Sequence, residues 1–479
     1  MIPAKRTLAA IILAVFLPAF FLTRCANIVP PNGGPKDTIP PVLLSATPRD
    51  SSLNFHAGRI VLNFDEYIQA LDPGRALIFT PSVLRQPFLV TKFRTLTIEL
   101  KDSLKANTTY TLNFGNSIRD LDEGNPIRDF RYIFSTGGYL DSLTVSGQVT
   151  YAETGLPDSN IVVMLYYDLS DSVVSRQKPV YYTLSDGKGN FRLENLPRGV
   201  FKLFALKDNN NSLAYQDSSE FIAFRDSPLV VNGNVSAEHL YLFAAASKTS
   251  PSIGSGPVSP GIPGAPSLPG KNAKKRPARN VTVTPQFGFG GVDITIPLTL
   301  TLDQKAREFD STKVHLLEDT THRPVPFSAA LDSAGTSIFI NRNWDPDMDY
   351  RLILDSEMVR DSSGAYSRQD TLNFHTRSES DYGSIILGFK GVDSSRNNLV
   401  EIVSNGEIQY SGPLRGNTWR KDMVRPGAYE VRLLEDRNGN GKWDNGRYYG
   451  KKRQPEHVIG FPVQIHVRAN WQNRTQLSL

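Results

Sequence analysis

Short runs of alternating apolar and polar residues, separated by polar turns, recur from about residue 41 to the end of this chain. Examples are IVLNF at 60–64, LTIEL at 96–100, YTLNF at 110–114 and FRYIF at 130–134. A period of two residues is the pattern of a half-buried β-strand. Short strands with turns at regular intervals predict antiparallel β-sandwiches, and no segment after residue 25 shows a long period of 3.6 residues. The fold class is therefore predicted to be all-β.

Two internal repeats divide the chain further. Tyr110-Thr-Leu112 matches Tyr350-Arg-Leu352, and Phe134-Ser-Thr136 matches Phe374-His-Thr376, each 240 residues later. A second repeat relates Pro197-Arg-Gly199 to Arg425-Pro-Gly427. Repeats of this kind indicate tandem copies of a folding unit. The 479 residues, too many for one core, are predicted to form two pairs of β-domains, A–B–linker–A′–B′.

The predicted limits follow from these repeats and from changes in composition. They are a signal peptide over 1–24, a Pro/Gly-rich tether over 25–40, β-domains over 41–138 and 141–245, a Pro/Gly/Ser linker over 246–280, and β-domains over 281–378 and 383–479.

The N-terminus resembles an export signal. Lys5 and Arg6 precede an uncharged apolar run over residues 8–22, which is shorter than a membrane span usually needs, so an N-terminal signal helix is predicted. An uncleaved signal anchor is the alternative. Cys25, the only cysteine, directly follows this run and can form no internal disulfide. Residues 22–25 (LTRC) resemble a bacterial lipobox, although Arg24 stands where a small residue is expected.

Lipidation of Cys25 is therefore predicted, and a stray buried cysteine is the alternative. The implied setting is the bacterial cell envelope, as an outer-membrane lipoprotein on the periplasmic or surface face. The formal net charge of +5 gives no case for nucleic acid. A basic cluster over residues 271–279 is interpreted either as a contact for anionic lipid or as a solvated linker end.

Residues 41–137 resemble a bacterial Ig-like domain of the SbsA type. The similarity is carried by Ile60-Val-Leu-Asn-Phe64-Asp65-Glu66, Asn107-Thr-Thr-Tyr110, Ile118-Arg-Asp120 and Phe134-Ser-Thr-Gly137. The N-terminal part from Cys25 onward is similar to lipoproteins of Bacteroidetes-type bacteria. Residues 281–377 look like a degenerate copy, in which Leu300-Thr-Leu-Asp303 replaces the Phe-Asp-Glu run. A role of Asp65 and Glu66 is not expected to transfer to that copy.

Residues 143–245 and 383–479 resemble transthyretin-like or carboxypeptidase-regulatory-like β-sandwiches. The cue is Gly189-Asn-Phe191-Arg-Leu193 followed by Leu196-Pro-Arg-Gly199. The resemblance implies structural spacers and adhesion parts rather than enzymes.

One loop has the spacing of a calcium site. Oxygen side chains alternate along a Gly-rich turn, with the Lys442 carbonyl between them, as in an EF-hand-type loop. The predicted ligands are Asp436, Asn438, Asn440, Lys442 and Asp444, and a weaker sister loop contains Asp208, Asn210, Ser212 and Glu220. Arg447 stands where the bidentate Glu should be. The alternative is a turn whose side chains cap their own backbone. Structural calcium is the only cofactor predicted.

The functional hypotheses follow from an anchor, tandem β-domains and the lack of a catalytic motif. The first is a non-enzymatic structural or interaction lipoprotein, with an adhesion or scaffold role toward an envelope protein or cell-wall partner. The second is a glycan-binding lipoprotein of a polysaccharide-uptake system, with Trp443 and Tyr448 as stacking residues, although such aromatics are more often core residues. A hydrolase is the third, and it needs a His or carboxylate pair within hydrogen-bond reach.

Overall fold

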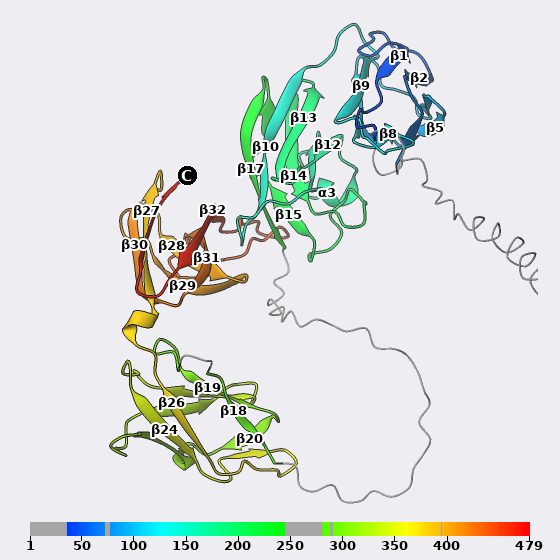
Figure 1. The fold of residues 1–479 in the computed structure, drawn as a ribbon. Helices are drawn as coiled ribbons and strands as arrows, with labels where there is room; N and C mark the ends of the chain where they lie inside the picture. Colours follow the sequence, from blue (N-terminus) through cyan, green and yellow to red (C-terminus); the bar gives the residue numbers. More distant parts are fainter. Residues whose placement is uncertain (1–35, 72–76, 245–279, 288–290, 394) are drawn as a thin grey trace, which may run out of the picture. The chain divides into compact units, whose positions relative to one another are not determined.

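The computed structural model describes residues 36–71, 77–244, 280–287, 291–393 and 395–479 (Figure 1). Cys25, the predicted signal helix and residues 246–279 of the predicted linker lie outside the described residues. The described residues form four β-sandwiches, numbered here 1 to 4 in chain order. The all-β fold class is confirmed. No helix in these ranges is long and apolar enough to cross a bilayer.

Sandwich 1 has a four-stranded sheet in the order β1-β2-β6-β5, a three-stranded sheet in the order β4-β7-β9, and a short pair β3-β8. Its strands are β1 (Leu43–Thr47), β2 (Arg59–Phe64), β3 (Ile68–Ala70), β4 (Ile78–Thr80), β5 (Phe88–Lys92), β6 (Thr95–Glu99), β7 (Thr109–Gly115), β8 (Ile118–Asp120) and β9 (Phe130–Ser135).

Sandwich 3 repeats this topology strand for strand, with sheets β18-β19-β23-β22 and β21-β24-β26 and the pair β20-β25. Its elements are β18 (Val283–Pro285), β19 (Leu298–Leu302), β20 (Ala306–Phe309), the 3₁₀ turn η1 (Ser311–Lys313), β21 (Val314–Glu318), β22 (Ser328–Leu331), β23 (Ser337–Asn341), β24 (Asp349–Leu354), β25 (Val359–Asp361) and β26 (Asp370–His375).

Equivalent side chains build the two cores. Tyr110 and Phe134 stack with ring centroids 5.4 Å apart in sandwich 1, and Tyr350 and Phe374 stack at 5.8 Å in sandwich 3. The first repeat is thus confirmed as a repeat of core packing.

One expectation about sandwich 3 is wrong. The Asp65 carboxylate accepts a hydrogen bond from the Val42 backbone N–H at 2.8 Å, and Asp303 accepts the same bond from Thr282 at 2.7 Å. The role of Asp65 does transfer, because each aspartate clamps the chain where it enters its sandwich. That role needs only a carboxylate after β2 or β19, and the rest of the Phe-Asp-Glu run is dispensable for it.

Sandwich 2 forms one continuous path of strands in the order β12-β11-β14-β15-β17-β10-β13, with β16 also paired to β14. Its elements are β10 (Leu143–Tyr151), β11 (Val162–Tyr166), α3 (Val173–Arg176), β12 (Tyr181–Leu184), β13 (Asn190–Leu196), β14 (Gly199–Leu206), β15 (Phe221–Phe224), β16 (Leu229–Val231) and β17 (Val235–Ala244).

Sandwich 4 has the same strand neighbours in two separate sheets, β30-β27-β33 and β29-β28-β31-β32. Its elements are η2 (Glu379–Asp381), β27 (Gly383–Lys390), β28 (Asn398–Ser404), β29 (Glu407–Pro413), β30 (Thr418–Val424), β31 (Gly427–Glu435), β32 (Val458–Val467) and β33 (Gln472–Ser478). Both sandwiches contain a parallel pair, β10 with β17 and β27 with β33.

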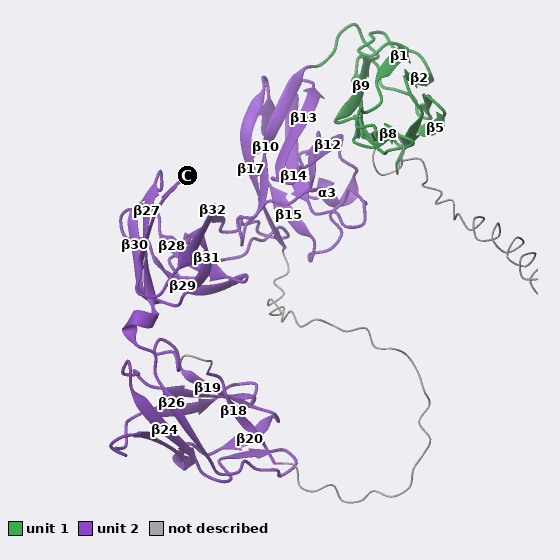
Figure 2. Ribbon diagram, viewed as in Figure 1, with its two compact units in different colours: residues 1–141 green, residues 142–479 purple. Residues whose placement is uncertain are grey.

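By compactness the chain divides into two units, residues 1–141 and 142–479 (Figure 2). The first unit holds sandwich 1 and the second holds sandwiches 2, 3 and 4. Within the second unit, sandwich 3 joins sandwich 4 through a cluster of polar contacts around Asp293. Tyr382 donates to the Asp293 carboxylate at 3.0 Å, and Arg425 pairs with the same carboxylate at 3.0 Å.

Candidate functional site: the contact between sandwiches 2 and 4

Sandwich 2 has a sheet that is apolar on both faces. Every residue of β11 is buried, as are the last six of β14, whereas a half-exposed strand would alternate. One face packs into the sandwich core. The outer face needs its own cover, which comes partly from α3 and from Tyr215. The rest of the cover comes from sandwich 4.

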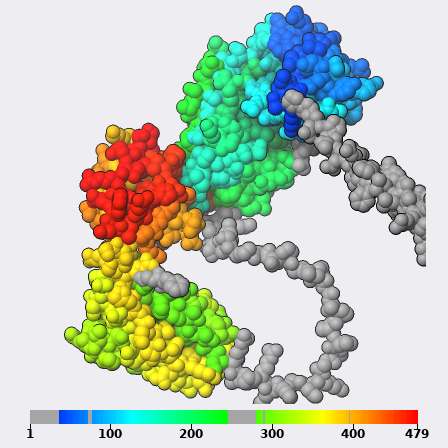
Figure 3. Space-filling view, in the orientation of Figure 1, coloured from blue at the N-terminus to red at the C-terminus, as the bar shows by residue number. Residues whose placement is uncertain are grey.

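An excursion between β31 and β32 of sandwich 4 supplies that cover. We call residues 444–457 the arm. Its Tyr448 is only 4 % exposed and packs edge-on against Tyr215, with ring centroids 5.5 Å apart, and against Phe204 at 6.0 Å. Its hydroxyl donates to the backbone carbonyl of Asp171. A residue of sandwich 4 is therefore part of the core of sandwich 2. In the space-filling view, the surface of sandwich 4 (orange to red) meets that of sandwich 2 (cyan to green) (Figure 3).

Polar contacts hold the arm on both sides of Tyr448. The Asn445 side chain donates to the carbonyl of Ala244 at 2.7 Å, and the Gln454 side chain donates to that of Phe224 at 2.9 Å. Asp171 pairs with Lys202 of its own sandwich at 2.8 Å and with Lys452 of the arm at 2.5 Å. Hydrogen bonds from these two ammonium groups lower the pKa of Asp171.

A glycine makes the approach possible. A Cβ built on Gly446 would lie 2.7 Å from the ring of Phe243. A side chain at this position would force Phe243 or the arm to shift, so glycine allows the arm to lie close to the sheet.

The backbone of the two sandwiches also meets directly. The N–H of Val458, at the start of edge strand β32, donates to the carbonyl of Ala152 at 2.8 Å. Gly155, with φ of +69°, lies so close that its Cβ would be 2.5 Å from the Val458 carbonyl. The turn after β10 thereby covers an open sheet edge that would otherwise invite pairing with another chain.

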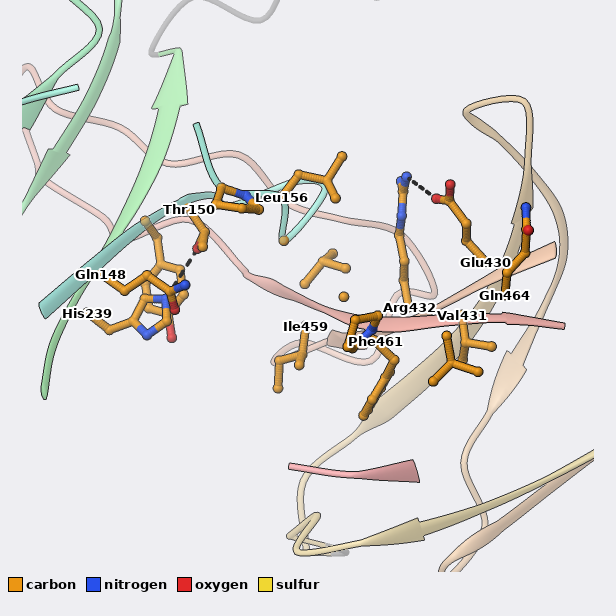
Figure 4. Close-up of a pocket in the computed structure, with 17 residues that line it drawn as sticks. Gln148, Thr150, Leu156, His239, Glu430, Val431, Arg432, Ile459, Phe461 and Gln464 are labelled. Carbon is orange, nitrogen blue, oxygen red and sulfur yellow. Dashed lines mark hydrogen bonds and ion pairs between the residues drawn. The ribbon is translucent and has the colours of Figure 1, made fainter. Parts of the chain in front are cut away.

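A groove of about 580 Å³ opens beside this contact (Figure 4). Gln148, Thr150 and His239 line the side that belongs to sandwich 2, and Arg432 and Gln464 line the side of sandwich 4. The volume is within the range of sites for small ligands. The lining offers hydrogen-bond donors and acceptors.

Three rings stack across the boundary next to the groove. Tyr241 lies between His239, with centroids 4.7 Å apart, and His457 of the arm, at 4.2 Å. Burial of the ring, and secondarily the neighbouring His457, lower the pKa of His239. A side-chain hydrogen bond from His457 lowers the pKa of Glu435.

The predicted calcium loop lies directly before the arm. The Asp436 carboxylate accepts hydrogen bonds from the backbone N–H groups of Gly439, Asn440 and Gly441, at 2.7 to 3.1 Å. The Asn438 and Asn440 amide groups both donate to the Asp444 carboxylate. The oxygens that would bind an ion therefore accept hydrogen bonds from their own loop, as the alternative interpretation requires.

The weaker loop has the same pattern. Asp208 accepts from the N–H groups of Asn210, Ser212 and Leu213, while the Glu220 carboxylate accepts from Gln216. Among the described residues, no group of three or more His, Cys, Asp or Glu is arranged to hold a metal ion. The predicted ligand sets also rely on amide, hydroxyl and carbonyl oxygens, so calcium at either loop stays a prediction.

The interpretation of Tyr448 as a sugar-stacking residue is wrong, because both faces of its ring are enclosed by sandwich 2. Trp443 is half-buried, and its indole N–H donates to the Glu456 carbonyl at 2.6 Å. The arm itself was not predicted. Its signal was present in the unbroken apolar runs IVVMLYY at 161–167 and LFAL at 203–206, which indicate strands buried on two faces.

Pairs of histidine and carboxylate do occur. His375 is hydrogen-bonded through one ring nitrogen to Asp349 at 2.8 Å and through the other to Asp347 at 3.1 Å. The bond with Asp349 is the main cause of the raised pKa of His375. A ring with both nitrogens engaged by carboxylates has no lone pair free to act as a general base.

Comparisons with known proteins identify one segment. Residues 37–136 match the bacterial Ig-like domain family. This match covers sandwich 1, where the sequence predicted such a domain. A search of curated proteins found no match.

Solved structures with similarity to this chain include α-2-macroglobulin from Escherichia coli, spanning domains MG0-NIE-MG1. It is 11 % identical, with 38 % of this chain and 72 % of that chain covered and a TM-score of 0.19. The major pilin subunit BcpA of Bacillus cereus is 9 % identical, with coverage of 70 % and 99 % and a TM-score of 0.17. The N-terminal part of the bacterial S-layer protein SbsC is 15 % identical, with coverage of 41 % and 42 % and a TM-score of 0.16. TM-scores this low carry no information on function.

Proposed function

We propose that this chain is a non-enzymatic lipoprotein of the bacterial cell envelope, anchored through Cys25 in the outer membrane, that serves as a structural or interaction scaffold. The observation that carries the proposal is the arm contact. Tyr448, Asn445 and Gln454 join sandwich 4 to sandwich 2, although the residues paired by the two side-chain hydrogen bonds are 201 and 230 positions apart in the chain. A scaffold needs joints of this kind, since separate β-domains on a chain would otherwise move independently.

The anchor and the partner are tested separately. Intact-mass measurement of the mature protein shows whether Cys25 is the lipidated N-terminus. Crosslinking in whole envelopes followed by purification of the full chain identifies what the scaffold binds. The matched control is Tyr448→Ala, which keeps the anchor and weakens the contact between sandwiches 2 and 4. A partner that binds across the two joined sandwiches is expected to be lost with this variant. Turnover of a small molecule by the purified chain contradicts a non-enzymatic role.

A glycan-binding role is the second candidate, and the groove beside the arm favours it. Gln148 and Gln464 face the groove from opposite sides and offer amide groups suited to sugar hydroxyls. Binding of the full chain on a glycan array, abolished by Gln148→Ala and Gln464→Ala together, supports this role. An array without hits removes it.

A further inference from the structure

Sandwich 1 exposes a group of large apolar side chains at one end. Phe93 is 66 % exposed, Leu121 52 % and Tyr67 49 %. The rings of Tyr67 and Phe93 lie 5.8 Å apart, and the Arg94 guanidinium lies 5.5 Å from the centre of the Tyr67 ring. The Leu121 N–H donates to the Tyr67 carbonyl at 2.9 Å. We call these four residues, with Ile39, the aromatic tip.

The aromatic tip lies where the described chain enters sandwich 1. The Asn125 side chain, in the loop after Leu121, donates to the carbonyl of Asp37 at 3.1 Å, which holds the entering segment against this loop. Ile39, two residues on, is 65 % exposed. The chain leaves at the opposite end, where the Asp141 N–H donates to Thr109 at the start of β7.

The residues before the tip limit its distance from the membrane. Ten residues, 26–35, lie between Cys25 and Lys36. A fully extended chain spans at most about 3.3–3.6 Å per residue, so Lys36 lies within about 40 Å of a lipid attached to Cys25, and Ile39 within about 50 Å. The chain enters sandwich 1 at this end, so the tether is attached to the side of the domain that carries the aromatic tip.

We infer that the aromatic tip of sandwich 1 docks on the lipid bilayer, with Tyr67, Phe93 and Leu121 entering the headgroup region. This inference rests on the proposed anchor at Cys25. Tyr67 suits the membrane interface because its ring is apolar and its hydroxyl is polar, whereas Phe93 and Leu121 contribute apolar surface alone. Docking orients sandwich 1 on the membrane.

The apolar side chains and not charge provide the attraction. Burial, and then the neighbouring Asp120, Asp65, Asp37 and Glu123, raise the pKa of the Glu66 carboxyl, so several carboxylates gather at the end that also carries Arg94. These carboxylates repel anionic headgroups. Docking is therefore expected on zwitterionic lipid and is expected to be insensitive to salt, unlike a contact made by basic residues.

The test places a tryptophan at the tip of the full chain, which is purified in detergent and reconstituted into phosphatidylethanolamine and phosphatidylcholine vesicles with brominated acyl chains. Phe93→Trp is the main probe, and Tyr67→Trp is the second because Phe93 has a strained φ of +55°. The matched control is Leu84→Trp, because Leu84 is 93 % exposed. Leu84 precedes β5 and Phe93 follows it, so the two residues lie toward opposite ends of this strand.

Interfacial side chains lie about 5–10 Å into the headgroup and acyl boundary, so the tip tryptophan is expected to lose about half of its emission to bromine. The four native tryptophans give the background, which is measured with the wild-type chain. The control is expected to add no quenching. Equal quenching at both positions, or none at either, overturns the inference. Failure of the chain to float with the vesicles contradicts the anchor itself, whereas flotation without quenching contradicts only the docking of the tip.

Discussion

Truncation of Tyr448 to alanine is expected to weaken sandwich 2, although the substitution lies in sandwich 4. The ring is 4 % exposed and fills the outer face of the sheet between Phe204, Tyr215 and Phe224. Removal of a buried aromatic ring costs about 3–5 kcal/mol. The lower figure, about 3 kcal/mol, suits a site that water can enter once the arm has moved, and it corresponds to about 150-fold at 1.36 kcal/mol for each factor of ten.

The assay is amide hydrogen exchange in the full chain. Amides of β11 and β14 are expected to exchange about 150-fold faster in Tyr448→Ala, because the outer face of their sheet loses its cover. Strand β24 of sandwich 3, which shares no core residue with Tyr448, is the internal reference.

Two variants separate the ring from its hydroxyl and from its neighbour. Tyr448→Phe keeps the ring and loses only the hydrogen bond to Asp171, for a cost of about 1 kcal/mol. Tyr449→Ala removes an adjacent ring that is 50 % exposed, and is expected to cost less than Tyr448→Ala. The reasoning is refuted if Tyr448→Ala leaves the exchange of β11 and β14 as slow as in the wild type, or if Tyr449→Ala has the larger effect.

Three further predictions concern this contact and the Asp436 loop beside it. Gly446→Ala is expected to destabilise by about 1–3 kcal/mol, since its Cβ would meet Phe243 at 2.7 Å, and Gly58→Ala in open space is the control for melting. Lowering the pH below 6.5 is expected to lower the melting temperature, because the pKa of His239 is lowered in the folded chain and the unfolded chain takes up a proton that the folded chain does not. The contribution of His239 to stability is complete above pH 6.5. A His239→Gln chain whose melting temperature falls with pH as steeply as that of the wild type contradicts this. Asp436→Ala removes the acceptor of three backbone N–H groups and is expected to lower the melting temperature in chelator. A larger loss in calcium than in chelator supports the predicted metal, and an equal loss supports the self-capped turn.

Local patterns were sufficient to predict much of the fold. The alternation around Tyr110 and Tyr350 identified strands, and their spacing of 240 residues identified two copies of one sandwich. Side chains that alternate along a strand have only one way to reach a core, so this information is contained in short segments. The Asp436 loop was also located correctly, because Asx turns are made within a few residues.

The role of Asp303 shows where a motif comparison is too strict. The run that follows β2 is not preserved in the second copy, yet Asp65 and Asp303 make the same hydrogen bond. A clamp on one backbone N–H depends on the position of a single carboxylate, so it can persist where the rest of the run differs.

The amino-acid sequence by itself determined the all-β class, the repeated topology and the strands that build each core, because these depend on the period of the apolar residues. Only the tertiary structure decided that Tyr448 belongs to the core of sandwich 2 and that Gly446 lies against Phe243. The apolar runs of β11 and β14 show that their sheet needs a cover on each face, but an apolar face is not specific for the residue that covers it. The choice was made by the shape of the arm and by its hydrogen bonds to Asp171, Phe224 and Ala244, which bring together residues far apart in the chain.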